Sequence, residues 1–417
     1  MKGKRKGGCI KLLVRANIAN PRSFRKRQVI SMTTSLSALA VLPDDVDAPA
    51  LLAELRRWVE IESHTPDVAG VNAMVDRAEA YAKACGLTIE RQPGKPGYGD
   101  VLIVRSGQAG EGEKGLLILA HLDTVHARGT LANRLNWREE ANRIYGPGIY
   151  DMKSGALMTL EALRLALATG NGPKLPVTIV FGPDEETGSI SSRDVIEAEG
   201  RKARYALVVE PARDGGKIVV ARKGVAIFDI GVFGKASHAG THPQNGVSAI
   251  REAAKIVLKL EALNDFERGI TVTVGQIEGG AGRNIIPAEC HLKVDVRLPD
   301  AEAQNEVLAF ISGLKPDDER IGLEIAGGMN RPAFPRSAAG DALFAHARDV
   351  AKSLDIDLVG VTTGGGSDGN FTAALGVATL DGLGADGAGA HTHEEYILKD
   401  SIKPRTALLA NLILSLE

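Results

Sequence analysis

Short apolar runs that stop at polar residues recur along the chain, separated by segments with apolar residues three or four positions apart. A short apolar run predicts a buried strand of a parallel sheet, and the wider spacing predicts an amphipathic helix. The predicted strands cover residues 87–91, 101–104, 116–120, 177–181, 205–209 and 377–380, and the predicted helices cover 48–61, 72–85, 151–169, 341–354 and 401–416. This alternation predicts an α/β fold with a mixed, mostly parallel sheet and helices on both faces.

The pattern changes between residues 222 and 331. Strands with apolar residues at alternate positions are expected there, together with two further helices. In chain order the elements are strand 225–233, helix 246–263, strands 271–277 and 290–298, helix 301–314 and strand 323–325. The order β-α-β-β-α-β is that of a ferredoxin-like α+β domain. We therefore predict a catalytic domain over 46–221 and 332–417, interrupted by an inserted domain over 222–331.

Composition narrows the possible functions. The chain has 417 residues, 44% of them hydrophobic, and a formal net charge of −2. Its length favours two domains, and its charge gives no reason to expect nucleic-acid binding. The three cysteines are scattered and form no metal-binding pair motif. The sequence contains no apolar run long enough to predict a membrane span.

The first 45 residues differ in character, because lysine and arginine are frequent and no acidic residue precedes Asp44. A targeting segment is one interpretation, but the apolar stretch 36–42 is short and the Ala-Leu-Ala triplet lies inside it. A basic anion-binding arm is another. The preferred interpretation is a disordered extension, or translation from an upstream start with Met32 as the true beginning. Cytoplasmic localisation is expected, with the periplasm and secretion as alternatives.

Polar residues that can bind metal follow several of the predicted strands. They are His121 and Asp123, Asp151, Glu185 and Glu186, Glu210, and His391 or His393. Each has an ordinary explanation, such as a helix N-cap for Asp151 or a charged loop for the glutamate pair. Together they occupy the edge where open α/β sheets bind ligands. Two imidazoles and three carboxylates suit two zinc ions, and one glutamate of the pair is left to accept a proton from water.

A series of motifs then resembles a known family, the di-zinc amidohydrolases that include aminoacylase, succinyl-diaminopimelate desuccinylase and glutamate carboxypeptidase (carboxypeptidase G). The resemblance spans about residues 50–417 and is greatest to the carboxypeptidase G branch. The motifs are HLDTV (121–125), GIYDMKSG (148–155), PDEETGS (183–189), VVEPA (208–212), GKASHAG (234–240), NIIP (284–287), DVR (295–297), GGGSDGN (364–370) and AHTHEE (390–395).

The resemblance implies a role for each motif residue. Asp151 would bridge two Zn²⁺ ions, His121 and Glu210 would complete one site, and Glu186 and His391 the other; Co²⁺ or Mn²⁺ could substitute. Asp123 would fix the tautomer of His121, and Glu185 would be the general base and then the acid. His391 is preferred to His393 because it begins the pattern H-T-x-x-E.

In the inserted domain, the resemblance implies a lid and a homodimer interface. His238 would reach the partner's active site and stabilise the oxyanion, although a histidine in a turn is the simpler explanation. Asn284, Arg297 and Arg331 would bind substrate, with Arg331 placed to clamp a carboxylate. The glycine loop 364–369 lacks the lysine of a phosphate-binding loop, so it is interpreted as backbone packed around the substrate's carboxylate.

These features predict a metal-dependent hydrolase that cleaves an amide or peptide bond and releases a C-terminal amino acid from a small peptide or N-acyl amino acid. An aminoacylase, dipeptidase or desuccinylase of the same family is the alternative. A non-catalytic ligand-binding homologue would lack a ligand or the base, and none is missing here. A magnesium phosphohydrolase is disfavoured because two histidine ligands suit a softer metal.

Overall fold

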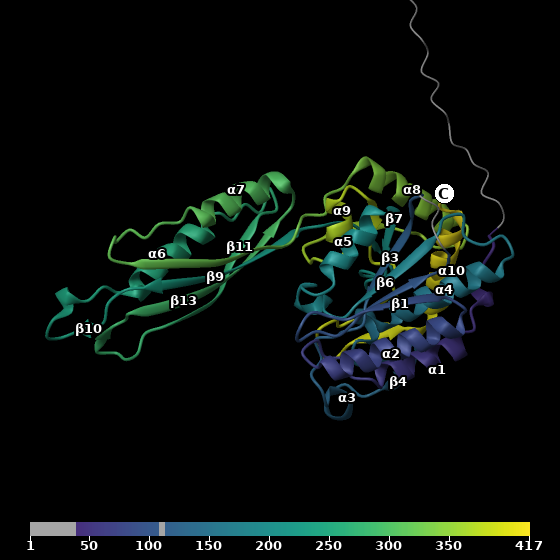
Figure 1. Ribbon diagram of the computed structural model, residues 1–417, viewed down its shortest axis with the longest axis horizontal. Helices are drawn as coiled ribbons and strands as arrows, with labels where there is room; N and C mark the ends of the chain where they lie inside the picture. The colour runs from purple at the N-terminus through teal and green to yellow at the C-terminus, as the bar shows by residue number, and fades with distance from the viewer. Residues whose placement is uncertain (1–38, 108–112) are drawn as a thin grey trace, which may run out of the picture. The chain divides into compact units, whose positions relative to one another are not determined.

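The computed structural model describes residues 39–107 and 113–417. A six-stranded sheet has the strand order β1-β2-β6-β3-β7-β16 (Figure 1). Its strands are β1 (Thr88–Gln92), β2 (Val101–Arg105), β3 (Gly115–His121), β6 (Val177–Gly182), β7 (Ala203–Val208) and β16 (Ala378–Leu380). Strand β3 runs parallel to β6 and β7, and β16 runs parallel to β7, whereas β1 and β2 are antiparallel. The predicted mixed, mostly parallel sheet is confirmed.

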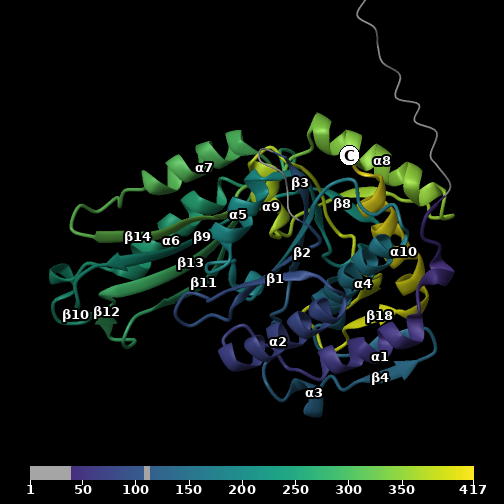
Figure 2. The ribbon, with the colours of Figure 1, turned by 45° about the vertical axis from the view of Figure 1, so that its right-hand side comes forward.

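Alternate residues of β3 enter two separate apolar cores, one on each face of this sheet. Leu116 and Ile118 join the larger core, with helices α1 (Ala48–Val59), α2 (Val68–Ala84), α4 (Ser154–Ala168), α8 (Ala338–Lys352) and α10 (Lys399–Ser415). Leu117 and Leu119 join the smaller core, with α5 (Arg193–Arg201) and α9 (Gly369–Ala374). Because successive strand residues point to opposite faces, a strand covered by helices on both sides is apolar throughout. Figure 2 shows the helices around the strands.

The inserted segment forms a four-stranded antiparallel sheet with the order β11-β13-β9-β14. Its elements follow the predicted order: β9 (Gly224–Phe233), α6 (Ala249–Glu261), β11 (Thr271–Gly279), β13 (Glu289–Leu298), α7 (Ala301–Ser312) and β14 (Gly322–Arg331). Phe228, Ile230 and Val232 alternate into its core against α6 and α7. A small pair, β10 (Ser237–His238) and β12 (Ile285–Ile286), lies within the β9–α6 and β11–β13 connections. The ferredoxin-like order is confirmed.

The two chain connections of this insert lie side by side. Strands β9 and β14 pair, with Val225 opposite Arg331. Arg222 and Phe334 exchange two backbone hydrogen bonds of 2.8 and 3.0 Å. The side-chain amide of Asn370 donates to the carbonyl oxygens of Lys223, at 3.1 Å, and Pro332, at 2.7 Å. One side chain therefore binds both connections.

Several short elements are not predicted by the sequence pattern. Strands β17 (Gly387–Ala388), β18 (Tyr396–Leu398), β5 (Arg143–Tyr145) and β4 (Arg138–Glu140) form a sheet, and β15 (Gly360–Thr363) pairs with β8 (Ile218–Arg222). Single turns of helix are η1 (Pro43–Asp45), α3 (Thr130–Asn133), η2 (Ile149–Lys153), η3 (Glu185–Thr187) and η4 (Pro243–Asn245). Asp151 is therefore no N-cap: it lies in η2, with φ −114° and ψ 91°, and α4 begins after it.

The predicted disordered extension over residues 1–45 falls mostly outside the described residues, which begin at 39. Its last part is ordered, because Val41 is buried and Asn411 of α10 accepts from the backbone N–H of Ala40 and donates to the carbonyl of Val41. Residues 40 and 41 are thus packed against helix α10. Within 39–107 and 113–417, no helix has both the length and the apolar character that a membrane crossing needs.

Candidate metal centre

The candidate ligands follow the carboxyl ends of neighbouring parallel strands. His121 is the last residue of β3 and lies opposite Gly182, the last residue of β6. Glu186 lies in the turn that follows β6, and Glu210 lies two residues after β7. Parallel pairing brings these chain ends to one edge of the sheet, as the sequence pattern predicts.

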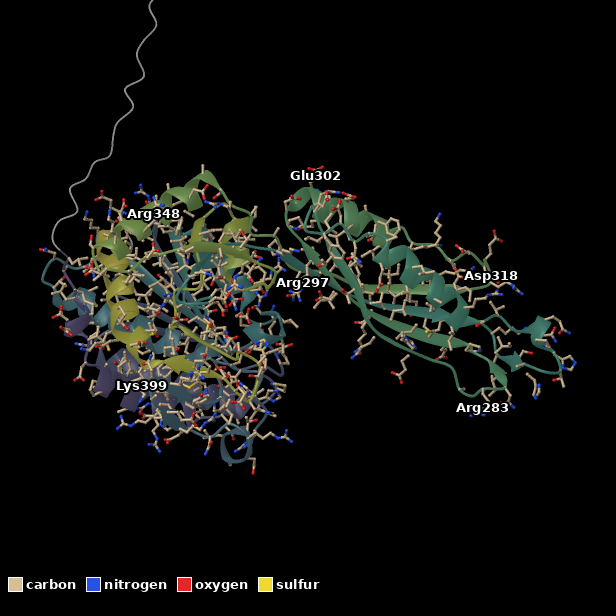
Figure 3. All side chains as sticks on the ribbon, turned by 180° about the vertical axis from the view of Figure 1, so that it is seen from behind. Arg283, Arg297, Glu302, Asp318, Arg348 and Lys399 are labelled. Carbon is tan, nitrogen blue, oxygen red and sulfur yellow. The ribbon has the colours of Figure 1, made fainter. Side chains whose placement is uncertain are left out.

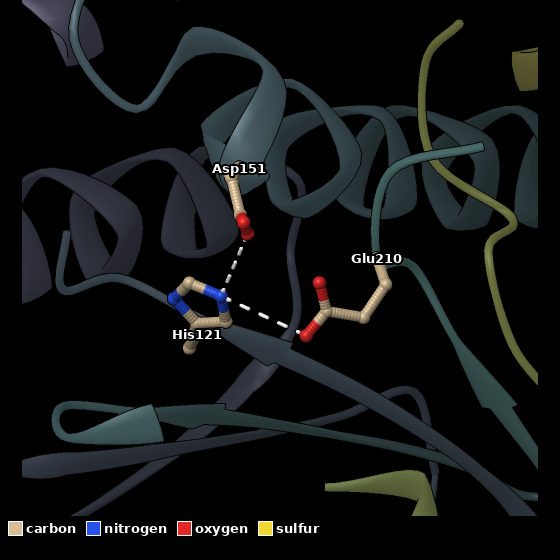
Figure 4. A group of neighbouring side chains, drawn as sticks. All are labelled: His121, Asp151 and Glu210. Carbon is tan, nitrogen blue, oxygen red and sulfur yellow. Dashed lines mark hydrogen bonds and ion pairs between the residues drawn. The ribbon is translucent and has the colours of Figure 1, made fainter. Parts of the chain in front are cut away.

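Figure 4 shows the first group of ligand atoms, which comes from three different elements. The Nε2 atom of His121 lies 3.2 Å from Asp151 Oδ1 and 3.7 Å from Glu210 Oε1. His121 and Glu210 are buried, and Asp151 is half-buried. The three side chains converge on one point from β3, the η2 turn and the segment after β7.

The second group uses the other oxygen of the same aspartate. His391 Nε2 lies 3.3 Å from Asp151 Oδ2 and 3.1 Å from Glu186 Oε2. His391 has a positive φ of 64°, a conformation that few residues other than glycine adopt. Asp151 thus offers one carboxylate oxygen to each group, which is the geometry expected of a carboxylate shared by two ions.

These residues fit a pair of divalent cations. In each group the candidate ligand atoms lie within 4.8 Å of one another. Zinc holds its ligands at about 2.0–2.2 Å, so tetrahedral neighbours lie roughly 3.3 Å apart. In addition, Glu186 Oε1 is buried without a hydrogen-bond partner. A buried carboxylate oxygen is costly unless a cation or donor satisfies it, so the orphaned atom supports metal binding.

Burial and neighbouring charges shift the pKa values of several groups in this cluster. Burial raises the pKa of Glu186 to about 8, with Asp151 adding to the effect, and burial also raises the pKa of Glu210. Hydrogen bonds to Asp151 and Glu186 raise the pKa of His391 to about 11. Burial opposes the charged form of His121, but hydrogen bonds to Asp123 and Asp151 outweigh it and raise its pKa. Protons therefore compensate the negative charge in this cluster.

Asp123 organises both sides of this cluster. The Nδ1 atom of His121 lies 3.0 Å from the Asp123 carbonyl oxygen and 3.4 Å from its carboxylate. The carboxylate also accepts from the backbone N–H groups of Glu185, at 3.1 Å, and Glu186, at 3.2 Å, and from Thr65 Oγ1 at 2.7 Å. The predicted contact with His121 is present, and the contacts to the Glu185–Glu186 backbone and to Thr65 were not foreseen.

Glu185 belongs to neither group of ligand atoms among the described residues. Its Oε1 atom accepts from Arg331 Nη2 at 2.8 Å. Burial raises the pKa of Glu185 to about 7, although Arg331 and His121 oppose the shift. A carboxylate with a pKa near neutrality beside a metal site can both accept and return a proton.

Arg331, the predicted carboxylate clamp, is buried, with 4% exposure. Its guanidinium donates to Asp368 Oδ1 at 2.8 Å and to Ser189 Oγ at 2.9 Å. It also donates to two oxygens of Glu185, the backbone carbonyl at 2.9 Å and the carboxylate Oε1 at 2.8 Å. Two carboxylates thus hold it in this structure. Its role in substrate binding stays a prediction.

The other predicted residues lie in the insert. His238 is exposed, and its Nδ1 atom accepts from the backbone N–H groups of Gly240 and Thr241, both at 3.1 Å. Asn284 lies beside it, since its carbonyl accepts from Ala239 N at 2.9 Å. Arg297, labelled in Figure 3, pairs with Asp295 at 2.7 Å and donates to the Gly364 carbonyl at 3.4 Å. The structure therefore brings His238 and Asn284 together, and Arg297 to the glycine loop.

Some residues around the site were not identified from the sequence. Thr65 follows a helix and precedes Pro66, which indicates only the end of a unit. Asp368 lies in the glycine loop 364–369, for which the sequence predicts only backbone packed around the substrate's carboxylate. The available signal in the sequence was a single acidic residue in a glycine-rich loop. The structure shows that Asp368 is buried, and a buried carboxylate requires a partner.

A cluster of imidazoles and carboxylates at the carboxyl edge of a mainly parallel sheet, with a ferredoxin-like insert, defines a metal-dependent hydrolase of the α/β class. Comparison with known sequences supports this, because the profile of peptidase family M20/M25/M40 matches residues 117–415. The chain belongs to this family. The predicted resemblance and the predicted class of metal-dependent hydrolase are thereby confirmed, and the number and identity of the ions remain predictions.

Similar proteins include several with different names. Carboxypeptidase G2 of Pseudomonas sp. (strain RS-16) is 33% identical over 385 residues, which cover 89% of this chain and 90% of that protein. Acetylornithine deacetylase of Myxococcus xanthus is 30% identical over 286 residues, or 64% of this chain and 72% of that protein. The structure of aminopeptidase PepT from Bacillus cereus superposes with a TM-score of 0.71 at 23% identity, over 88% of this chain and 98% of that one. The last similarity shows the fold.

Proposed function

We propose that this protein is a zinc-dependent exopeptidase or amidohydrolase that releases a C-terminal amino acid from a small peptide or an N-acyl amino acid. The observation that carries the proposal is that the two carboxylate oxygens of Asp151 face two different histidines. Oδ1 lies 3.2 Å from His121 Nε2, and Oδ2 lies 3.3 Å from His391 Nε2. The similarity to carboxypeptidase G2 over most of both chains supports the carboxypeptidase assignment.

In this proposal, His121, Asp151 and Glu210 would hold one Zn²⁺ ion, and Asp151, Glu186 and His391 would hold the second. When bound, two such cations polarise the scissile carbonyl and lower the pKa of water towards about 7. His121 and Glu210 are buried at the ends of strands, whereas the side chain of His391 is 55% exposed. Asp123 orients His121 and holds the backbone of Glu186.

Glu185 then acts on the water as a general base and afterwards protonates the leaving amine. Its burial, which raises its pKa to about 7, suits both steps at neutral pH. Arg331 contacts its Oε1 atom and so limits how far the carboxylate can turn. Both the side chain and the backbone of Glu185 are therefore positioned, because Arg331 donates to its carboxylate and Asp123 accepts from its backbone N–H.

His238 is the proposed donor to the oxyanion. Because its Nδ1 atom accepts two backbone hydrogen bonds, the neutral ring carries its proton on Nε2. That proton is free to be donated to a developing negative charge, which is the role the family resemblance implies. We propose that it acts on the active site of the partner in a homodimer formed through the insert.

Substrate recognition is assigned to Asn284, Arg297 and Arg331. Cationic and amide donors suit the carboxylate of a released amino acid. Arg297 already lies against the glycine loop, 3.4 Å from the Gly364 carbonyl. Arg331 would need to exchange one of its carboxylate partners for the substrate. The similarity to acetylornithine deacetylase keeps an acyl-amino-acid amidohydrolase as the second candidate.

A substrate panel tests this proposal. Purified protein saturated with Zn²⁺ is incubated with N-acyl-glutamates, N-acyl-aspartates, neutral N-acyl amino acids, N-succinyl amino acids and dipeptides, and the free amine is measured. Fastest release from substrates with a C-terminal acidic residue supports a glutamate-carboxypeptidase activity. Preference for another acyl group assigns the second candidate, and no hydrolysis across the panel contradicts both. Light scattering at several concentrations tests the homodimer.

A further inference from the structure

Glu395 is a fully buried carboxylate close to the proposed metal centre, with 0% exposure. Both of its oxygens are engaged. Oε1 accepts from the backbone N–H groups of Tyr150, at 2.8 Å, and Asp151, at 2.9 Å. Oε2 accepts from Gly148 N at 3.0 Å and from His126 Nε2 at 2.6 Å. The carboxylate therefore has four donors, three of them from one turn of backbone.

That turn consists of Gly148 and the η2 segment that follows it, which carries Asp151. The φ and ψ angles of Asp151 are not helical, and the regular helix α4 begins only at Ser154. Without the regular hydrogen bonds of a helix, the N–H groups of Tyr150 and Asp151 need another acceptor, because buried backbone N–H groups are rarely left unpaired. Glu395 is that acceptor.

Glu395 is also only four residues from His391, in the same segment. Its own chain is anchored beyond the carboxylate, since β18 (Tyr396–Leu398) pairs with β5 (Arg143–Tyr145). One side chain therefore connects the backbone that positions Asp151 with the segment that carries His391. These two residues supply the shared carboxylate and one imidazole of the ligand groups.

We propose that Glu395, together with His126, is a positioning residue that sets the affinity of both metal sites by fixing the turn of Asp151 relative to the segment of His391. The inference rests on the proposed function only in taking those two groups as metal ligands. Glu395 is not itself in either group of convergent ligand atoms of the described residues. It acts through the backbone of Asp151 and not on the ions.

A buried carboxylate could instead merely stabilise the fold, and the two roles differ in what they change. A stabilising role lowers the unfolding free energy and leaves the metal affinity of the folded protein unchanged. A positioning role lowers the metal affinity of the folded protein, and because Asp151 is shared, it lowers the affinity at both sites. Partners that orient metal ligands are worth about 10–100-fold in metal affinity.

The test compares Glu395→Gln with Glu394→Gln, a matched control whose side chain is 81% exposed. The glutamine has nearly the same size, but its amide group faces donors and cannot accept from all four. Zinc affinity is measured by competition with a chelator of known affinity, without substrate, on protein shown by circular dichroism to be folded. We expect both zinc ions to bind about 10–100-fold more weakly in Glu395→Gln and unchanged in Glu394→Gln.

A second variant covers the case in which Glu395→Gln fails to fold. His126→Asn removes one of the four donors and leaves the three backbone contacts, and we expect a smaller loss of affinity in the same direction. Wild-type affinity in a folded Glu395→Gln protein, or in His126→Asn if the first does not fold, overturns the positioning role. A wild-type protein that binds no zinc overturns the proposed function as well, so the two failures are distinguishable.

Discussion

Replacement of Glu185 by glutamine separates metal binding from proton transfer. Glutamine keeps the size of the side chain, and its carbonyl oxygen can still accept from Arg331 Nη2, now 2.8 Å from Glu185 Oε1. The hydrogen bond from the residue's backbone N–H to Asp123 does not involve the side chain and also remains. The geometry of the site should therefore survive, while the ability to accept a proton is lost.

The size of the effect follows from the role assigned to this carboxylate. A positioned general base contributes about 10²–10⁴-fold to the rate. At about 1.36 kcal/mol for each factor of ten, the loss corresponds to about 3–5 kcal/mol of transition-state stabilisation. Burial raises the pKa of Glu185 to about 7, and a general base is most effective when its pKa lies close to the pH of the reaction, so the assay is run near pH 7. We therefore expect the upper half of that range.

The assay combines steady-state hydrolysis of the best substrate of the panel with metal analysis by mass spectrometry. Glu185→Gln should retain the wild-type metal content and lose kcat. The matched control is Glu186→Gln at the next position, which removes a proposed ligand 3.1 Å from His391 and should lose metal as well as activity. A Glu185→Gln protein with full metal content and a kcat within tenfold of wild type refutes the assignment of the base.

Three further predictions follow from the same structure. Zinc affinity should rise with pH between about 6 and 8. The pKa of His391 is raised to about 11 and that of Glu186 to about 8, so both residues hold protons that a metal ion must displace. Calorimetry in buffers of different ionisation enthalpy counts the protons released. Asp368→Asn should lower the unfolding free energy by about 3 kcal/mol in urea, since it removes one of the two carboxylates that pair with buried Arg331; an unchanged midpoint argues against that pair. Ile118→Ala, in the centre of β3, should cost about 2–5 kcal/mol in the same measurement, and a smaller change would place this strand outside the core.

Much of this fold could be predicted because each strand of the central sheet carries its own local signal. Residues 116–120 are apolar throughout, and the structure places Leu116 and Leu117 in different cores, which explains why no polar residue interrupts the run. The insert could be predicted for the opposite reason. One face of its sheet is not covered by helices, so buried and more exposed residues alternate along strands such as β13. The spacing of apolar residues along a strand reflects which of its faces are buried. Both faces are buried along β3, and one face is buried along β13.

The sheet formed by β5 and β18 could not be predicted in this way. Strands β5 and β18 have three residues each, and Tyr145 pairs with Tyr396 far along the chain. So short a segment has no measurable period, and its strand conformation depends on its partner. The same reason hid the position of Asp151, whose turn is held by Glu395, a residue 244 positions away.

The proposed ligands were found from the sequence because parallel strands bring their carboxyl ends to one edge. The partners of Arg331 could not be found, because Asp368 and Glu185 approach it from a distant loop and a distant turn. A sequence shows which residues carry charge, and only the packing of separate elements decides which charges neutralise one another.

The side-by-side arrangement of the insert's two connections has a consequence for the architecture of the chain. Neighbouring antiparallel strands lie only about 5 Å apart, so the ends left by excising the insert could be rejoined by a very short linker. Asn370, whose side chain donates to the carbonyls of Lys223 and Pro332 at the two connections, belongs to the catalytic domain. Excising the insert at this junction would leave a domain that keeps the proposed metal ligands and loses His238, Asn284, Arg297 and Arg331, so metal binding could be studied apart from substrate recognition.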